Sequence, residues 1–282
     1  METQSHGAPA GWHASLSLRF GPANGRTALK GRSHGGPLRV QKPLYPEGND
    51  LCHAVILHPP GGIAGGDTLN MDIEAEAGAR ALITTPGSGK WYRSGGQPAR
   101  QRVHVSVGAG AGLEWLPQES IFFDGVQASL ATEVTLDSDA VFLGLETFCL
   151  GRIAAGETFR QGSISISTRI ERNGTLLWAE QGRLTGGSKL LEAEPGLAGY
   201  PFSATFLATG PAMQRSVLDA CRAVPDPVGT RSGLTLLPSG LLAARCLAHQ
   251  SEPVREWFLA LWGVLRPLLL NRPAVVPRLW NT

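Results

Sequence analysis

Short segments in which apolar and polar residues alternate constrain the fold of this chain more than any other feature. Valines alternate with His104 and Ser106 over residues 103–107, and isoleucines alternate with serines over residues 163–167. Residues two apart lie on the same face of a strand, so each segment has one apolar and one polar face. The chain also has 36 glycines and 20 prolines, many of them between such segments. This combination is typical of turn-rich β structure.

These segments form a weak repeat. Strand–turn–strand units turn at Gly78-Ala79, Gly110-Ala111, Asp139-Ala140 and Asn173-Gly174, so that successive turns are 32, 29 and 34 residues apart. Repeated units at such spacing favour stacked coils, a β-solenoid-like body. A β-sandwich built from successive hairpins fits the same spacing.

The C-terminal third has a different pattern, which predicts two helices. Residues 213–224 form a candidate short helix. A second helix is predicted to begin with Ser251 as its N-cap and to end at Pro267. Its apolar residues recur at helical spacing: Val254, Trp257, Phe258, Leu261, Trp262 and Leu265. This apolar face packs either on the β body or on a partner protein. No linker-like segment divides the chain, so we predict a single domain over 1–282.

Composition and charge exclude several classes of protein. The net charge is +2 and the basic residues are scattered, which argues against a nucleic-acid partner. The longest apolar-rich stretch, 257–270, is too short for a membrane span and contains Arg266 and Pro267. The N-terminus has no apolar stretch typical of a secretory signal. Four widely spaced cysteines without a CxxC pair predict a cytoplasmic protein with reduced thiols.

The most unusual stretch is a loop over residues 58–67. Its prolines fix φ and its glycines allow conformations that other residues resist, so it follows a particular path and presents Asp67 at its end. A tight β turn capped by Asp67 is the simpler interpretation. The loop residues are His58, Pro59, Pro60, Gly61, Gly62, Gly65 and Gly66. Cys52 and His58 share one face of the preceding strand while His53 faces the other way, which argues against a closed zinc site.

Two stretches of the sequence have features of a nucleotide-binding or a catalytic motif. Residues 87–90 (GSGK) resemble the end of a phosphate-binding loop, but Thr84 and Trp91 stand where the motif needs Gly and a hydroxyl residue. Nucleotide binding is therefore not expected. Glu119 and Asp124 flank two phenylalanines and would suit the paired acids of a glycosidase. Solvated turn residues or structural hydrogen-bond acceptors are the alternative for these two acids.

Taken together, several segments resemble the UreD (also called UreH) family of urease accessory proteins, from about residue 16 to residue 280. Trp91 is a mild variation on the family pattern. The matching segments are 36–48 (GPLRVQKPLYPEG), 58–67 (HPPGGIAGGD), 82–87 (LITTPG), 90–94 (KWYRS), 113–119 (LEWLPQE), 123–125 (FDG) and 149–152 (CLGR).

The resemblance implies a mainly β protein with a β-helix-like body of stacked strands and two short helices in the C-terminal third. Residues 1–15 would be a flexible N-terminus. The family implies a non-catalytic scaffold that joins UreF and the GTPase UreG, as part of a dimeric UreD–UreF–UreG assembly, and docks on the urease apoprotein. It implies no tightly bound cofactor, but nickel in transit through a tunnel.

The resemblance also implies the residues of that tunnel. Asp67, Glu146 and Glu180 would be transient nickel ligands, with Ser88 beside them. Isolated carboxylates are weak and labile nickel ligands, which suits transfer better than a tight cage does. Counting from each turn predicts that Glu146 and Glu180 lie on neighbouring rungs, about 5 Å apart. Two carboxylates so close repel each other unless a cation or a proton lies between them.

Two other functions remain open at this point. One is a carbohydrate-active enzyme on a β-helix, which would use the paired acids Glu119 and Asp124. The other is an adhesive or structural solenoid, which would show no dependence on nickel and no urease partner.

Overall fold

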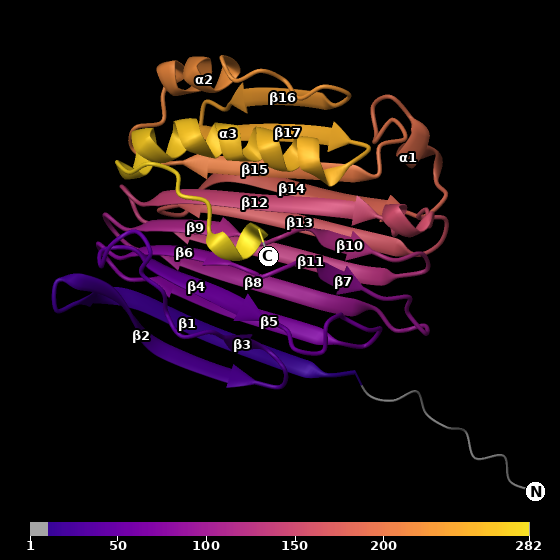
Figure 1. Cartoon of the computed structure of the whole chain (residues 1–282), viewed down its shortest axis with the longest axis horizontal. Helices are drawn as coiled ribbons and strands as arrows, with labels where there is room; N and C mark the ends of the chain where they lie inside the picture. Colours follow the sequence, from indigo (N-terminus) through magenta and orange to yellow (C-terminus); the bar gives the residue numbers. More distant parts are fainter. Residues whose placement is uncertain (1–10, 282) are drawn as a thin grey trace, which may run out of the picture.

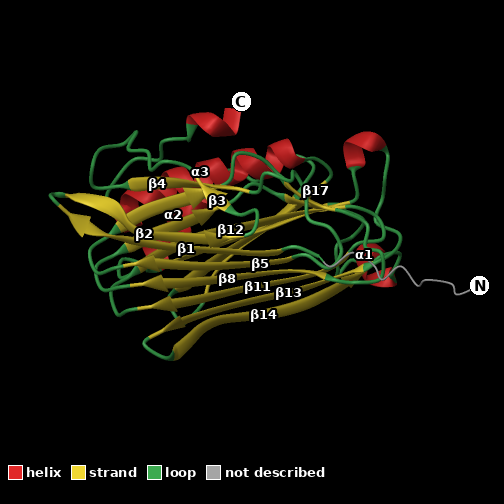
Figure 2. Cartoon of the chain, turned by 90° about the horizontal axis from the view of Figure 1, so that it is seen from below, coloured by secondary structure: helices red, strands yellow, loops and turns green. Residues whose placement is uncertain are grey.

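Most of the chain forms strands, and these strands build two sheets that face each other (Figures 1 and 2). The computed structural model describes residues 11–281. The strands of the seven-stranded sheet are, in spatial order, β14 (Thr175–Thr185), β13 (Ser163–Arg172), β11 (Gln127–Leu136), β8 (Ala99–Val107), β5 (Thr68–Ala75), β1 (His13–Ala23) and β2 (Arg26–Gly35).

The ten-stranded sheet forms the other layer. Its main path is β16 (Arg231–Leu236), β17 (Leu241–Ala248), β15 (Phe202–Thr209), β12 (Val141–Leu150), β9 (Gly112–Leu116), β6 (Arg80–Thr84), β4 (Cys52–Leu57) and β3 (Arg39–Val40). Two short strands, β10 (Ser120–Phe122) and β7 (Gly89–Trp91), pair with each other, and β10 also pairs with β12.

Between these sheets the chain winds as a β-solenoid of about four turns. It crosses from β5 to β6, from β8 to β9 and from β11 to β12 at the three turns predicted near residues 78, 110 and 139. Successive coils pair in parallel and in register, so that Asp72, His104 and Glu133 lie side by side on three strands. The prediction of stacked coils is therefore confirmed, and successive hairpins do not describe this part of the chain.

The fourth turn behaves differently. Asn173 and Gly174 both have positive φ and close an antiparallel hairpin between β13 and β14 within one sheet. Asn-Gly is the preferred pair for such a two-residue turn, because both positions must adopt left-handed conformations. The prediction that Glu146 and Glu180 lie on neighbouring rungs is therefore wrong. Glu146 lies on β12 in the ten-stranded sheet, and Glu180 lies on β14 in the facing sheet.

Two apolar clusters stabilise this arrangement. The first fills the space between the sheets and includes Phe20, Ile83 and Val105. The second lies on the outer face of the ten-stranded sheet, where α3 (Ser251–Leu270) covers β15 and β17, and α2 (Arg215–Arg222) packs against α3 and β16 (Figure 1). The apolar face of α3 thus packs on the β body, as one of the two sequence interpretations expected.

The helices differ in length from the prediction. The short helix α2 lies within the predicted range, but α3 has 20 residues and continues past Pro267, so the predicted end at Pro267 is wrong. Pro267 removes one helical hydrogen bond near the end of the helix, where Leu269 and Leu270 are buried and hold the last turn in place. The remaining helical turns were not predicted: α1 (Lys189–Glu192), η1 (Ile153–Ala155) and η2 (Arg278–Asn281).

The structure covers only part of the predicted flexible N-terminus, residues 1–15. Residues 1–10 of the expected flexible segment lie outside the described residues. By contrast, residues 13–15 already belong to β1, which pairs with both β2 and β5. Ala14 is buried between the sheets, and this burial accounts for the ordered start of the strand.

Candidate functional site

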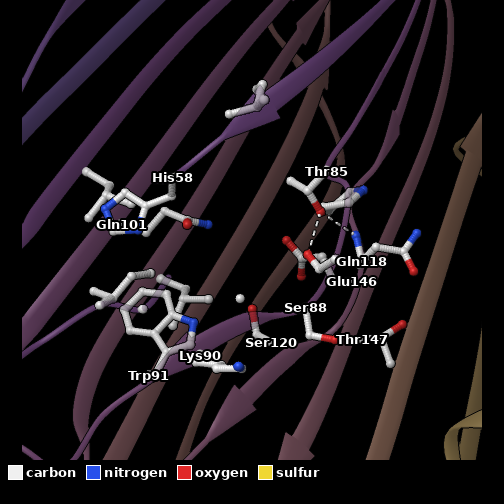
Figure 3. A pocket seen from close by; sticks show the side chains of 18 of the residues that line it. His58, Thr85, Ser88, Lys90, Trp91, Gln101, Gln118, Ser120, Glu146 and Thr147 are labelled. Atoms are coloured by element: carbon white, nitrogen blue, oxygen red, sulfur yellow. Dashed lines mark hydrogen bonds between the residues drawn. The ribbon is translucent and has the colours of Figure 1, made fainter. Parts of the chain in front are cut away.

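A cavity of about 290 Å³ lies between the inner faces of the two sheets (Figure 3). In Figure 3, His58 and Gln101 lie at one side of this cavity, and Glu146 lies at the other side together with Thr85 and Gln118. Apolar side chains, including that of Trp115, complete the wall. The cavity therefore joins groups from both sheets around a partly polar space inside the solenoid.

Glu146 provides the carboxylate of this cavity. Thr132 Oγ1 donates a hydrogen bond to Glu146 Oε1 at 2.7 Å, and Thr168 Oγ1 donates to Oε2 at 3.2 Å. Burial raises the pKa of Glu146, the two hydroxyl groups oppose that rise, and the charge of Glu180 adds to it. Within residues 11–281, no lysine, arginine or histidine pairs with this carboxylate. The site therefore favours a proton or an external cation on Glu146.

A polar row leads from Glu146 to the edge of the sheets. Thr132, Thr168 and Glu180 are register neighbours on β11, β13 and β14, and with Glu146 they line a small hollow of about 10 Å³. At the far end, Arg245 Nη2 on β17 donates to Glu180 Oε1 at 2.6 Å. The Glu180 side chain is 31% exposed, so the row ends at solvent. Glu146 and Glu180 are therefore brought together across the sandwich rather than along one sheet.

Sequence reasoning missed the two threonines that connect these acids. Each interrupts an otherwise apolar inward row: Thr132 lies between Leu130 and Val134, and Thr168 lies between two isoleucines, at 166 and 170. A hydroxyl group in such a row needs a buried partner, because an unsatisfied buried polar group is costly. This interruption of the alternating pattern was the signal available in the sequence.

Ser88 lies where two hollows adjoin. It lines the main cavity, and it also lines a second hollow of about 250 Å³ beside α3. Its hydroxyl group donates to Glu119 Oε1 at 2.6 Å. The structure thus places Ser88 in the cavity wall, on the same side as Glu146 in Figure 3.

Asp67 lies outside the cavity lining. Its carboxylate accepts backbone N–H groups from Trp12 and Ala64, each at 2.8 Å. Gly61 and Gly66 of the same loop have φ of +78° and +92°, values that favour glycine. The geometry is that of a shaped turn braced by Asp67, which was the simpler of the two sequence interpretations.

The comparison with known protein families gives one match over nearly the whole chain. Residues 13–281 match the family model described as UreD urease accessory protein. This chain belongs to the UreD family. A urease accessory protein UreD of Azoarcus sp. (strain BH72) is 50% identical over 277 residues, covering 98% of this chain and 96% of the relative. The UreD protein of Pseudomonas aeruginosa PAO1 is 47% identical over 271 residues, covering 96% and 95%.

The paired-acid interpretation gains no support from this UreD-family structure. Asp124 Oδ1 accepts the backbone N–H groups of Arg160 and Gln161, each at 2.7 Å, and so braces a loop. Glu119 is bonded to Ser88 and lines a hollow that Asp124 does not line. In the described residues, the two acids therefore act as separate structural acceptors.

A second buried group of charges in this UreD-family chain was also missed. Arg266 on α3 is fully buried and donates to carboxylate oxygens of both Glu47 and Glu114, at distances from 2.6 to 3.2 Å. Trp262 Nε1 donates to Glu114 Oε1 at 2.7 Å, and His53 Nε2 lies 2.8 Å from Glu47 Oε1. In the sequence Arg266 is only a break in an apolar stretch, because its partners lie 152 and 219 residues away.

Three further observations concern residues 11–281 of this UreD-family chain. No group of three or more His, Cys, Asp or Glu side chains in this range is arranged to hold a metal ion. No helix in this range combines the length and the apolar character needed to cross a membrane. All four cysteines fall in this range and are buried and unpaired.

Proposed function

We propose that this chain acts in maturation of the nickel centre of urease, as a non-catalytic scaffold that conducts nickel along the polar row from Glu146 to Glu180. Membership of the UreD family supports the accessory role. The observation that carries the conduit is the carboxylate of Glu146, which faces an internal cavity with two hydroxyl groups and no paired basic side chain among the described residues.

The chemistry of the row suits a cation in transit. Glu146 without a cation is favoured in its protonated form, and an entering Ni²⁺ ion would replace that proton. Carboxylate and hydroxyl oxygens bind nickel weakly and exchange it quickly. Because no described cluster offers three strong ligands, an ion held by Glu146 would remain free to move on to Glu180.

The partners follow from the accessory role. In this proposal the chain works in the cytoplasm with UreF, the GTPase UreG and the urease apoprotein, in a dimeric UreD–UreF–UreG assembly. The chain lacks a complete phosphate-binding loop, since Thr84 and Trp91 occupy two of its required positions. Nucleotide hydrolysis is therefore assigned to the GTPase partner.

The test is a deletion strain complemented with variants of this chain and grown at limiting nickel. Deletion is expected to leave urease subunits made but nickel-poor and inactive. The Glu146→Leu, Glu180→Leu double variant should still form complexes with the partners, because each change replaces a charge by an apolar group of similar size. Urease purified from that strain should nevertheless contain little nickel.

Glu133→Leu is the matched control, since Glu133 lies on the outer face of β11 and pairs with Arg102. It should support normal nickel loading. Normal urease activity in the deletion strain at limiting nickel would overturn the accessory role. Full nickel loading by the double variant would overturn the conduit while leaving the accessory role in place.

A further inference from the structure

The cavity has a second end whose chemistry differs from that of Glu146. His58 directly follows β4 and lines the cavity opposite Glu146, with Gln101 of β8 at the same side (Figure 3). The imidazole of His58 forms no hydrogen bond within residues 11–281, although the residue is only partly exposed. An imidazole that faces an internal cavity without a partner leaves at least one nitrogen available to a ligand.

Few charged groups surround this imidazole. Burial lowers the pKa of His58, and the nearby charge of Asp67 opposes that change only in part. An imidazole with no hydrogen-bond partner among the described residues presents a ring nitrogen that can coordinate a metal ion. Lys90 and Glu146 are the charged side chains that line the same cavity, and Lys90 is exposed to solvent, which screens its repulsion of a cation.

We propose that His58 is the receiving ligand of the passage, which binds Ni²⁺ through its imidazole at the cavity end opposite Glu146. The assignment rests on the proposed conduit function and adds a selectivity step to it. Gln101 supplies an amide oxygen on the facing sheet as a weaker second donor. An ion then moves from a nitrogen ligand to the oxygen ligands of Glu146 and the threonines.

The order of ligands has a physical purpose. Imidazole binds late first-row metals such as nickel, whereas magnesium and calcium prefer oxygen ligands. A passage lined by carboxylates alone would also accept Mg²⁺. One imidazole at the receiving end therefore discriminates against magnesium, while a single ring does not hold nickel too tightly for transfer.

The test uses His58→Gln and His58→Asn, which place an amide nitrogen near one or the other ring nitrogen. His104→Gln is the matched control, because His104 lies on the outer face of β8. Purified full-length chain, with its co-purifying partners, is loaded with Ni²⁺ in excess Mg²⁺. Nickel binding is measured by equilibrium dialysis, and imidazole ligation by X-ray absorption. Melting temperatures establish that each variant is folded, and two different substitutions guard against one failing to fold.

Both His58 variants should bind Ni²⁺ on the order of tenfold more weakly in excess Mg²⁺ and lose an imidazole from the absorption spectrum. In cells at limiting nickel, urease loading should fall with them and not with His104→Gln. Unchanged Ni²⁺ affinity and an unchanged spectrum in a folded His58 variant would overturn the assignment. If His58→Gln loads urease normally while Glu146→Leu does not, the receiving ligand is refuted and the conduit stands. If deletion of the whole chain has no effect, the proposed function itself fails.

Discussion

Glu114 and Glu146 lie on β9 and β12, adjacent strands of one sheet, yet their surroundings are opposite. Glu114 points to the outer face, where Arg266 and Trp262 of α3 donate to both of its oxygens. Glu146 points to the inner face, where only two threonine hydroxyl groups donate to it. The two acids thus differ in one respect that decides their roles, namely whether the fold supplies a positive charge.

The difference separates a structural acid from a candidate transport acid. A buried carboxylate paired with arginine is satisfied and resists exchange, because removing the partner leaves a buried charge. A carboxylate that receives only hydroxyl groups holds either a proton or a cation from outside. The acid without a built-in cation therefore lies on the inner face of the sandwich, and the acid with one lies on the helix-covered face.

The largest effect is expected from removing the built-in cation. Arg266→Leu leaves Glu114 buried without a counter-charge and leaves Glu47 with only the more distant Arg272, at 3.7 Å, and His53, which should lower the free energy of unfolding by about 3–5 kcal/mol. Urea unfolding of the full-length protein measures this loss. Arg215→Leu removes an exposed arginine that pairs with Asp219 on α2 and should change stability by about 1 kcal/mol or less. An equally small loss for Arg266→Leu would show that the outer-face acids do not depend on it.

The same substitution at the two acids should have effects of opposite sign. Glu114→Gln weakens charge-assisted hydrogen bonds to Arg266, and a loss of about 1.5–3 kcal/mol is expected. Glu146→Gln replaces a group whose charged form is disfavoured by burial with a neutral amide that still offers the threonines a partner, so stability at pH 7 should rise by about 1 kcal/mol. Thermal unfolding of both variants provides the comparison. A comparable loss at Glu146 would mean that it, too, has a fixed partner.

The pH dependence of the free energy of unfolding should also differ between an acid on the helix-covered face and Glu146 on the inner face. Although burial acts to raise it, hydrogen bonds from His53 and Arg266 lower the pKa of Glu47 to about 2. Its contribution to stability is present above the unfolded pKa of about 4.3 and is lost as the pH falls toward 2. Glu47→Gln should therefore be destabilising at pH 7, with a difference that closes in acid.

The raised pKa of Glu146 has the reverse consequence. The wild-type protein loses stability as the pH rises above the unfolded value, because the folded state must then release a proton from a favoured site. The stabilisation by Glu146→Gln should therefore grow with rising pH and vanish below about 4. Melting curves between pH 3 and pH 8 give both trends, and parallel curves for the two variants would contradict the contrast.

Local patterns in the sequence were sufficient for most of the fold. Alternating segments and the spacing of the turns predicted strands and suggested stacked coils, because strand periodicity and turn residues are local properties, but a β-sandwich of hairpins fitted the same spacing. The turn at Asn173-Gly174 was also correctly located, but whether a turn crosses to the facing sheet or closes a hairpin depends on its conformation. Because this turn closes a hairpin, Glu180 lies in the seven-stranded sheet and not in the ten-stranded sheet that contains Glu146.

The site was less accessible from the sequence, because its contacts are long-range. The resemblance indicated Glu146 and Glu180, and the structure brings them together through Thr132 and Thr168, whose polar character in an apolar row went unnoticed. The resemblance also indicated Asp67, but the carboxylate of Asp67 braces a turn. The sequence alone does not distinguish an acid that braces a turn from an acid that lacks a fixed partner, because the hydrogen-bond donors around each are known only from the structure.

The smallest expected effect concerns Glu180, which lies between the two extremes. Its partner Arg245 is exposed and lies over the Trp178 ring, so the pair should contribute no more than about 1 kcal/mol to stability. Arg245 also competes with any cation for the same carboxylate. Arg245→Gln should therefore leave the melting temperature nearly unchanged and increase Ni²⁺ affinity by roughly fivefold, the equivalent of about 1 kcal/mol. Arg183→Gln is the control. Arg183 is exposed on β14, the strand of Glu180, and it contacts Ser163 rather than an acid. Equilibrium dialysis with Ni²⁺ decides the matter: equal affinities for the two variants would show that Arg245 holds no site that nickel uses.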